Sequence, residues 1–517
     1  MNRCSKLLAW LALAGLSGLA GCASIDFDYP RIESIVLADT DGTSLGVRAT
    51  QLTESRPHDE SGFYPLSDGI DALTARLLLA ERAGRSIDTQ YYLVKDDAVG
   101  LAFIDALLRA ADRGVRVRLL VDDVFTKGYD AGMAALDSHP NFSVRIFNPF
   151  HRGAAGRAWS GLTDLTRVNR RMHTKTFTVD GQVTILGGRN IADEYFGARE
   201  DAKFGDLDVV GVGSIAGDVS MMFDTFWNHE TALPVPAFAE MPDDPAAQLK
   251  ILRDQLERAS EKIQETRYAQ AVRATALEFM DLERGVLEWA PYQLVYDSPD
   301  KGVRSKDGPS VAITRPLVEA LKSAKNELIV ISPYFVPRKT GIDFFSELQA
   351  RGVDVTIVTN SLAANNQVTV HGGYAPSRKP LLEKGVRIFE VRPDATVQGS
   401  EIVAASGAKA TLHTKAFLVD RQTAFVGSFN FDPRSANLNT ESGVIIESKR
   451  LGQEFGGTFD SGIKSQTYEL FLNDASKLRW RAFEDGREVI YTKEPQSTWS
   501  QRFIAGFVRL LPVKGQL

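Results

Sequence analysis

The chain has 517 residues, which is enough for two to four domains of ordinary size. Apolar residues make up 44% and charged residues 24%, and these shares exclude disorder, collagen-like repeats and coiled coil as descriptions of the whole chain. The formal net charge of −6 excludes a general basic field that would attract nucleic acid, although a local patch is compatible with it. Both cysteines, Cys4 and Cys22, lie near the start, so the body of the chain has no disulfide.

The first residues resemble a bacterial secretion signal. Arg3 and Lys6 precede an apolar run that is too short to span a bilayer, which takes ~20 apolar residues. Leu19-Ala20-Gly21-Cys22 then resembles a lipobox, at which the chain is cleaved and the cysteine receives a lipid. We expect a signal peptide over 1–21 and a lipid anchor on Cys22, with a plain signal peptide as the alternative. The protein would then face the periplasm of a bacterial cell envelope, at the outer membrane rather than the inner.

The rest of the chain contains an internal repeat. A buried strand, a helix and a second strand are expected in two places, at 86–93, 98–112 and 113–121 and again at 327–331, 342–350 and 351–358. Gly114 and Gly352 are 238 residues apart, and His173 and His413 are 240 residues apart. Strand–helix–strand order implies parallel strands joined by crossover helices. We therefore expect two similar α/β lobes, each a mixed, mostly parallel sheet flanked by helices, packed as a pseudo-dimer.

This pattern divides the chain after the signal peptide into five segments. They are a lead-in linker (22–60), a first lobe (61–240, motif 167–194), a helical insert (241–300), a second lobe (301–470, motif 407–434) and a C-terminal tail (471–517). The lead-in is expected to be irregular. Helical spacing of leucines in the insert predicts a helix that covers the junction between the lobes.

A motif of the form H-x-K-x4-D-x6-G-[GS]-x-N occurs once in each lobe with the same internal spacing. Its two copies are His173, Lys175, Asp180 and Asn190, and His413, Lys415, Asp420 and Asn430. Alternating apolar residues predict a strand, in which the histidine and the lysine point to the same face. The aspartate marks a hairpin turn, and the small residues after it let a backbone or ligand approach closely.

Two lobes that face each other would bring two imidazoles, two ammonium groups and two amides to one point. Lysine and asparagine side chains can stabilise the charge on a phosphodiester. One histidine can attack phosphorus while the other protonates the leaving oxygen. Asp180 and Asp420 are interpreted as structural because they lie at hairpin turns, and a direct chemical role is the alternative. The histidines are not clustered with carboxylates at ligand spacing, so we expect neither a metal nor another cofactor.

The duplicated motif resembles the signature of the phospholipase D superfamily. Within it, the segments 87–92, 113–120 and 169–173, together with 433–435 and 438–441, resemble cardiolipin synthases of the C type. The resemblance implies phosphatidyl transfer between phospholipids through a covalent phosphohistidine, which would make cardiolipin from phosphatidylglycerol with phosphatidylglycerol or phosphatidylethanolamine. The sequence does not say which lipid is the donor and which the acceptor. The lipobox is a departure, because cardiolipin synthases usually act at the inner membrane.

The resemblance also implies a role for each site residue. His173 is expected to be the nucleophile and His413 the general acid and later base, although the two could be exchanged. The phosphate would be held by side chains that both motif copies supply: Lys175, Lys415, Asn190 and Asn430. Glu441 would orient the second histidine, and Asp206 or Asp208 the first.

Further candidates are less specific. His371 and Tyr374 are either part of an acceptor pocket or structural residues of a loop. Arg170, with Arg167 and Arg171, either meets lipid head groups or forms a solvated face. A helical stripe near the C-terminus fits either an interfacial amphipathic helix or a helix packed on the body: Trp499, Phe503, Phe507 and Leu511.

The expected partners are a phospholipid membrane and phospholipid substrates, and no nucleic acid is expected. Three other functions stay open: a phospholipase D hydrolase that releases phosphatidate, a nuclease-type phosphodiesterase and a non-catalytic lipid-binding lipoprotein. The acidic charge and the lipid anchor argue against the nuclease. Two complete motif copies argue against the non-catalytic lipoprotein.

Overall fold

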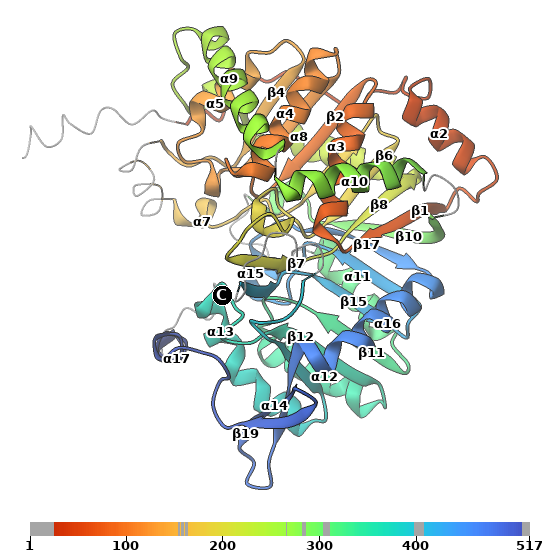
Figure 1. The fold of residues 1–517 in the computed structure, drawn as a ribbon, viewed down its shortest axis with the longest axis vertical. Coiled ribbons are helices and arrows are strands. Elements are labelled where there is room, and N and C mark those ends of the chain that lie inside the picture. Colours follow the sequence, from red (N-terminus) through yellow and green to blue (C-terminus); the bar gives the residue numbers. More distant parts are fainter. Residues whose placement is uncertain are drawn as a thin grey trace, which may run out of the picture.

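The computed structural model describes residues 25–152, 156, 160, 164–264, 266–281, 286–302, 311–397 and 408–508. The expected signal peptide, the lipidation site Cys22 and Leu511 lie outside the described residues. Two lobes follow one another along the long axis of the molecule, the first coloured from red to yellow and the second from cyan to blue (Figure 1).

Strands and helices of the first lobe alternate as the repeat predicts. The strands are β1 (Glu60–Leu66), β2 (Ser86–Tyr91), β3 (Arg116–Asp122), β4 (Phe142–Phe147), β5 (Thr176–Val179), β6 (Val183–Gly187), β7 (Ala202–Gly205), β8 (Asp208–Gly213) and β9 (Ala232–Pro234). The helices are α2 (Ser44–Thr53), α3 (Gly69–Arg82), α4 (Ala98–Asp112), α5 (Asp130–Asp137), α7 (Leu165–Val168) and α8 (Ser214–Trp227). Two longer helices follow, α9 (Pro245–Gln264) and α10 (Arg267–Asp281).

The second lobe repeats this order and adds strands at its end. Its strands are β10 (Glu288–Tyr296), β11 (Glu327–Ile331), β12 (Asp354–Asn360), β13 (Arg387–Val391), β14 (Lys409–Leu412), β15 (Ala416–Val419), β16 (Thr423–Gly427), β17 (Ser442–Glu447), β18 (Thr467–Leu472), β19 (Leu478–Glu484) and β20 (Arg487–Tyr491). Its helices are α11 (Val311–Lys322), α12 (Arg338–Ala350), α13 (Val368–Tyr374), α14 (Arg378–Glu383), α15 (Pro433–Asn437), α16 (Lys449–Gln466) and α17 (Trp499–Val508).

One mixed sheet runs through both lobes, because β10 pairs with β1 at one end and with β17 at the other. Parallel pairing in this sheet joins β2, β3 and β4 in the first lobe and β11, β12 and β13 in the second. The hairpins β5–β6 and β15–β16 lie antiparallel beside them. The two-lobed α/β class is therefore confirmed. The expectation of mostly parallel sheets was wrong, because each hairpin returns the chain in the opposite direction.

The repeat is visible at the level of single residues. Helix α4 is followed by Gly114 and helix α12 by Gly352, and both glycines have a φ of 92°. Only glycine adopts this left-handed conformation without strain, and it lets the chain leave a helix and enter the next strand. The two glycines, 238 residues apart in the sequence, therefore mark two equivalent helix-to-strand turns.

The sequence suggested that the helical insert covers the junction between the lobes. In the structure the insert packs on the first lobe instead. Helix α9 packs on α4 and α5, and α10 packs on α3. Leu256 and Tyr268 of the insert are buried in the core of the first lobe. The apolar side of the insert thus matches the outer helices of that lobe. The end of the expected insert is a strand, β10, rather than a helix.

The lead-in is not irregular throughout, because it contains helix α2. The Thr43 side chain accepts a hydrogen bond from the main-chain N–H of Gly46 at 3.0 Å and so begins this helix. Leu45 and Ala49 then bury one side of it against the first lobe. Helix α2 lies at the edge of the upper lobe in Figure 1.

The C-terminal tail begins with the antiparallel strands β19 and β20 and ends in helix α17. Ala505 and Val508 are buried where α17 packs on α13. The side chains of Trp499, Phe503 and Phe507 are 71%, 58% and 52% exposed. Helix α17 therefore packs on the body along one side and exposes an aromatic stripe on the other. None of the described helices has the length and apolar character needed to cross a bilayer.

A third core joins the lobes, in addition to one core inside each. Phe223, Phe226 and Trp227 of α8 in the first lobe belong to it, as do Val444 and Ile446 of β17 in the second. Burial of large aromatic side chains is a main source of packing energy. This shared core fixes the relative position of the two motif hairpins.

Candidate active site

The two motif hairpins differ in turn sequence but share a turn geometry. Asp180 and Gly181 have φ values of 53° and 65°, and Asp420 and Arg421 have 50° and 52°. Positive φ at both central residues gives a turn whose twist matches that of the two strands. The weaker turn signal at Asp420-Arg421 thus gives the same turn as Asp180-Gly181.

The aspartate of each motif binds main chain at this turn. Asp180 accepts hydrogen bonds from the N–H groups of residues 84–86 at 2.8 to 3.0 Å. Asp420 accepts equivalent bonds from residues 325–327 at 2.8 to 3.0 Å. The carboxylates tie each hairpin to the start of β2 or β11. Both contacts agree with a structural role and place the aspartates at the end of the hairpin away from the histidines.

Each histidine lies just before its hairpin, in a segment that pairs with the other lobe. The parallel strands β7 and β14 join the lobes, and the main-chain N–H of His413 donates to the carbonyl of Gly205 at 2.7 Å. On the other side, Met172 forms a β-bridge with Thr440, and the N–H of His173 donates to the Thr440 carbonyl at 2.9 Å. The residues that follow Gly205 and Thr440 therefore lie beside the histidines.

Those residues are the two acids, Asp206 and Glu441. Glu441 Oε2 lies 2.8 Å from Nδ1 of His173, and Asp206 Oδ2 lies 2.6 Å from Nδ1 of His413. The sequence-based expectation that each acid orients the histidine of its own lobe was wrong. Strand pairing between the lobes places each acid on the histidine of the opposite lobe. Asp208 is not a partner of His173, because its carboxylate binds the buried Arg76 at 2.8 Å.

Small residues that follow the returning strands β6 and β16 contact both acids. The hydroxyls of Ser428 and Ser435 donate to Glu441 at 2.6 and 2.7 Å. In the first lobe, the position equivalent to Ser428 is Gly188, where an added Cβ would lie 2.2 Å from Oδ1 of Asp206. The motif position that is glycine or serine thus contacts an acid in both lobes.

The lysines and asparagines of both motifs are buried beside the histidines, as the motif predicted. Lys175 and Lys415 are each 1% exposed, and Asn190 and Asn430 are 2% and 3% exposed. The carboxamide oxygen of each asparagine has no hydrogen-bond partner within the described residues. Each asparagine therefore retains hydrogen-bonding capacity for a ligand.

The site holds its histidines neutral at rest. Burial lowers the pKa of His173 to about 4 against the opposing effect of Glu441, and both Lys175 and Lys415 add to the lowering. Burial together with Lys415 and Lys175 lowers the pKa of His413 to about 3, against Asp206. Each histidine thus senses the lysines of both lobes, which shows that the two motif copies share one site.

The lysines and the acids are shifted in a complementary way. Burial lowers the pKa of Lys175 to about 7 and that of Lys415 to about 8. Burial alone would raise the pKa of Glu441, but His173 and Lys175 lower it overall. The pKa of Asp206 is lowered as well, because Lys415 and His413 outweigh burial. Near neutral pH both acids are therefore ionised, Lys415 is largely charged and Lys175 is about half charged.

Aromatic rings pack around the histidines. The rings of Tyr92 and His173 meet edge to face with centroids 5.0 Å apart, and those of Tyr195 and His413 do the same at 5.0 Å. The Tyr195 hydroxyl accepts a hydrogen bond from Asn190 at 3.0 Å. Burial raises the pKa of both Tyr92 and Tyr195. The charge of Asp122 adds to this at Tyr92, and that of Tyr334 adds a smaller amount at both, as expected for a residue near both rings. We did not predict these tyrosines, although Tyr92 follows the carboxyl end of β2, where ligands of α/β sheets bind.

Three of the less specific candidates contact other protein groups. Arg170 donates to the main-chain carbonyls of Lys301 at 2.6 Å and Asn437 at 3.3 Å, and so links the two lobes. His371 is 1% exposed with Nε2 3.5 Å from Glu494, and the Tyr374 hydroxyl donates to Glu390 at 3.0 Å. Their proposed place in a substrate pocket stays a prediction.

No cluster of three or more histidine, cysteine, aspartate or glutamate side chains is arranged to hold a metal ion among the residues that the structure describes. Each carboxylate next to a histidine forms a hydrogen bond with Nδ1 of that histidine. It does not point, together with a ring nitrogen, to a common position that a metal could occupy. The donor set of the site is cationic and suits an anion.

Two lobes with two histidine–acid pairs and two buried lysines around one point define an enzyme that transfers a group from a phosphodiester. A family model described as "Cardiolipin synthase, PLD-like domain" matches residues 78–211 and 317–463. The chain belongs to this family, and thereby to the phospholipase D superfamily of phosphatidyltransferases and phosphodiesterases.

Individual relatives agree with this assignment. The chain is 39% identical to cardiolipin synthase C of Escherichia coli (strain K12) over 464 residues, which cover 88% of this chain and 96% of the relative. It is 24% identical to a cardiolipin synthase of Staphylococcus aureus (strain Mu50) over 77% of this chain and 67% of the relative. The crystal structure of phosphatidylserine synthase from Haemophilus influenzae Rd KW20 shares the fold, with a TM-score of 0.57 and 14% identity over 91% of this chain and 99% of that one.

Proposed function

We propose that this protein makes cardiolipin by phosphatidyl transfer. One phosphatidylglycerol would be the donor, which releases glycerol, and a second phosphatidylglycerol the acceptor through its glycerol hydroxyl. Where phosphatidylethanolamine takes part it would be the donor and release ethanolamine, because cardiolipin keeps the glycerol of the acceptor. The observation that carries the proposal is the pair of crossed contacts His173–Glu441 and His413–Asp206 around one point beside the buried Lys175 and Lys415. The 39% identity to a cardiolipin synthase supports the choice of lipid substrates.

The nucleophile in this proposal is Nε2 of His173. Lys415 Nζ lies 3.1 Å from Nε2 of His413, where it competes for the lone pair that an attack would need. Each lysine donates to the main-chain carbonyl of the histidine two residues before it, but among the described residues Lys175 makes no hydrogen bond to the His173 ring. Glu441 accepts the Nδ1 hydrogen of His173 and stabilises the positive charge that develops on the ring during attack.

The reaction then has two steps. His173 attacks phosphorus, the P–O bond to glycerol breaks, and His413 gives its proton to the leaving glycerol oxygen. In the second step His413 removes a proton from the acceptor hydroxyl, which attacks phosphorus and releases His173. The negative phosphodiester favours the charged form of a nearby histidine, so the proton that His413 needs is taken up when substrate binds. Lys175 and Lys415 neutralise the developing charge.

Product analysis tests the proposal. Purified protein would be incubated with vesicles of phosphatidylglycerol and phosphatidylethanolamine, and the lipids analysed by mass spectrometry. Cardiolipin from the wild type and none from His173→Ala is the expected result. Phosphatidate without cardiolipin would show that the enzyme hydrolyses the lipid rather than transfers the phosphatidyl group. No lipid product at all would overturn the proposal.

Trapping the covalent intermediate tests the assignment of the nucleophile. The substrate would be a diester with a labelled phosphatidyl group and a good leaving group, which needs no proton from His413. After acid-free quenching, His413→Ala should still carry label on His173. His173→Ala should accumulate none. Label on His413 in the His173→Ala variant would show that His413 is the nucleophile and His173 the general acid.

We further propose that the protein is anchored by a lipid on Cys22 in the bacterial envelope and binds the membrane surface through α17. Exposed aromatic residues such as Trp499 and Phe503 suit the membrane interface. Helix α17 packs on α13, and α13 starts two residues after Asn366. Asn366 accepts a hydrogen bond from Tyr334 at 2.9 Å, so a short path of contacts connects α17 to the tyrosines of the site. Fractionation of cells that express Cys22→Ser tests the anchor, and the variant should leave the membrane fraction.

A further inference from the structure

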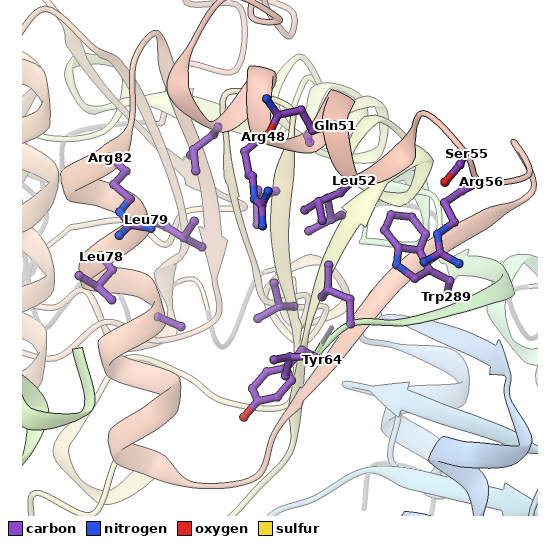
Figure 2. A pocket seen from close by; sticks show the side chains of 18 residues that line it. Arg48, Gln51, Leu52, Ser55, Arg56, Tyr64, Leu78, Leu79, Arg82 and Trp289 are labelled. Atoms are coloured by element: carbon purple, nitrogen blue, oxygen red, sulfur yellow. The ribbon is translucent and has the colours of Figure 1, made fainter. Parts of the chain in front are cut away.

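A cavity of about 520 Å³ lies on the first lobe, away from the histidines. Helices α2 and α3 form its walls, and strands β6, β8 and the beginning of β10 form its floor (Figure 2). Val183, at the start of β6, lines it, whereas the other end of β6 leads to Gly188 at the active site. None of the residues that line the cavity belongs to the catalytic set, so it is a separate feature.

The floor of the cavity is apolar. Leu52 and Leu79 face it from the two helices, and Val210 and Leu287 line it from the strands with Trp289. All five side chains are only partly buried in the structure. The volume of the cavity lies within the range of pockets that bind small molecules, about 300–1,000 Å³. A ligand with a large apolar part would remove this surface from water.

The rim of the cavity is basic. Among the described residues that line it, the charged ones are Arg48, Arg56 and Arg82, and none is an aspartate or glutamate. Figure 2 shows Arg48 reaching from α2 over the floor, with Arg82 on the facing helix. The Arg56 guanidinium lies 5.0 Å from the centre of the Trp289 ring. Three arginines gathered around one opening contrast with the net charge of −6 of the whole chain.

We propose that this cavity binds the acyl chain of an amphiphile whose anionic head group is held by arginines that line it. The apolar floor accepts the chain, and guanidinium groups bind phosphate or carboxylate in a bidentate manner. Two sources share this chemistry, an anionic phospholipid and a free fatty acid. Because the cavity lies at the end of the β5–β6 hairpin away from His173, an occupant leaves the active site open. The site is therefore a second lipid site, independent of the proposed transfer reaction.

Fluorescence quenching of Trp289 tests this site. Full-length protein would be titrated with a brominated fatty acid and, separately, with a brominated anionic lysophospholipid, each below its micelle concentration. Bromine quenches tryptophan only at short range, so saturable quenching is expected in the wild type and should be largely lost in Trp289→Phe. Tighter binding of one probe identifies the source of the ligand. Absence of saturable quenching by both probes overturns the proposal.

Matched variants test the two halves of the cavity. Arg48→Gln/Arg82→Gln should weaken binding at least ~10-fold, or ~1.4 kcal/mol. Val210→Phe, which fills the floor, should do the same without any change of charge. Arg487→Gln, an exposed arginine on β20, should bind as the wild type does. Equal affinity of all four proteins, or equal binding of a brominated fatty alcohol with no charge, overturns the proposal.

His173→Ala separates this inference from the proposed reaction. The variant should lose product formation but keep the quenching titration of the wild type. Loss of quenching in His173→Ala would place the probe at the catalytic site and overturn the second site, whatever the enzyme makes.

Discussion

Each motif histidine contacts a carboxylate from the other lobe. His173 and Glu441 are 268 residues apart in the sequence, and His413 and Asp206 are 207 apart. A carboxylate on Nδ1 fixes the tautomer of the ring and leaves Nε2 toward the substrate. Substitutions in one lobe therefore change the chemistry of the histidine in the other.

Glu441→Gln tests this dependence. The amide keeps the shape of the side chain but loses the charge that supports His173, so kcat should fall by roughly 10²- to 10⁴-fold. The midpoint of thermal unfolding should change little. Glu447→Gln, an exposed carboxylate at the end of the neighbouring strand β17, is the control. Activity within a factor of about two of the wild type would show that Glu441 does not support His173.

The lowered pKa values of the site predict its pH dependence. Below about pH 4 His173 is protonated and cannot attack. For a diester with a good leaving group, which needs no proton from His413, kcat/KM should therefore rise as the pH increases through about 4. Above about pH 7 Lys175 loses its proton and its positive charge, so kcat/KM should fall. Lys175→Arg should move this alkaline limb toward the pKa of Lys415, about 8. If the alkaline fall in kcat/KM is unchanged in Lys175→Arg, deprotonation of Lys175 is not its cause.

The motif aspartate is predicted to act on stability rather than on catalysis. Asp180→Ala leaves three main-chain N–H groups without their acceptor and should lower the free energy of unfolding by about 2–3 kcal/mol. The kcat of the folded fraction should stay near that of the wild type at low temperature. A large loss of kcat with unchanged denaturant unfolding would instead give Asp180 a chemical role.

At the scale of elements, the hairpin and the strand pair between the lobes act together. The β5–β6 hairpin ends at Gly188, and β7 ends at Gly205 just before Asp206. Because Gly188 lies against the Asp206 carboxylate, the hairpin of the first lobe also positions His413 of the second. The motif glycine is thus a positioning residue for the opposite histidine.

Gly188→Ala measures this coupling. The new methyl group would displace Asp206 from His413, and kcat should fall about 10- to 100-fold. Gly217→Ala in α8 is the matched control, since nothing lies within 4 Å of its added Cβ, and alanine in a helix should stabilise the protein by about 0.5–1 kcal/mol. Equal activity of the two variants would show that Gly188 does not position Asp206.

At the scale of the whole molecule, α17 extends the second lobe with an exposed aromatic stripe. Phe503→Ser/Phe507→Ser should weaken binding to phosphatidylglycerol vesicles by at least about 10-fold in a sedimentation assay, because it removes apolar area that enters the interface. Activity on a soluble diester should not change. Phe483→Ser, at an exposed phenylalanine of β19, should bind as the wild type does. Equal sedimentation of both variants would exclude α17 as the contact.

The sequence by itself determined the parts of this protein that depend on neighbours along the chain. The repeat of Gly114 and Gly352, the helix over 98–112 and the two hairpins follow from local periodicity and turn chemistry. The same holds for the histidine, lysine and asparagine of each motif, which the spacing alone places on one hairpin.

Only the tertiary structure decided which groups act on each other. The pairing of β7 with β14 and the bridge from Met172 to Thr440 place each acid on the opposite histidine. Hydrogen bonds between strands far apart in sequence leave no local pattern, so neither this exchange nor the approach of Tyr334 to Tyr92 could be predicted. The cavity beneath α2 was equally hidden, since Arg48, Arg82 and Trp289 come from three separate elements that only packing of the first lobe brings together.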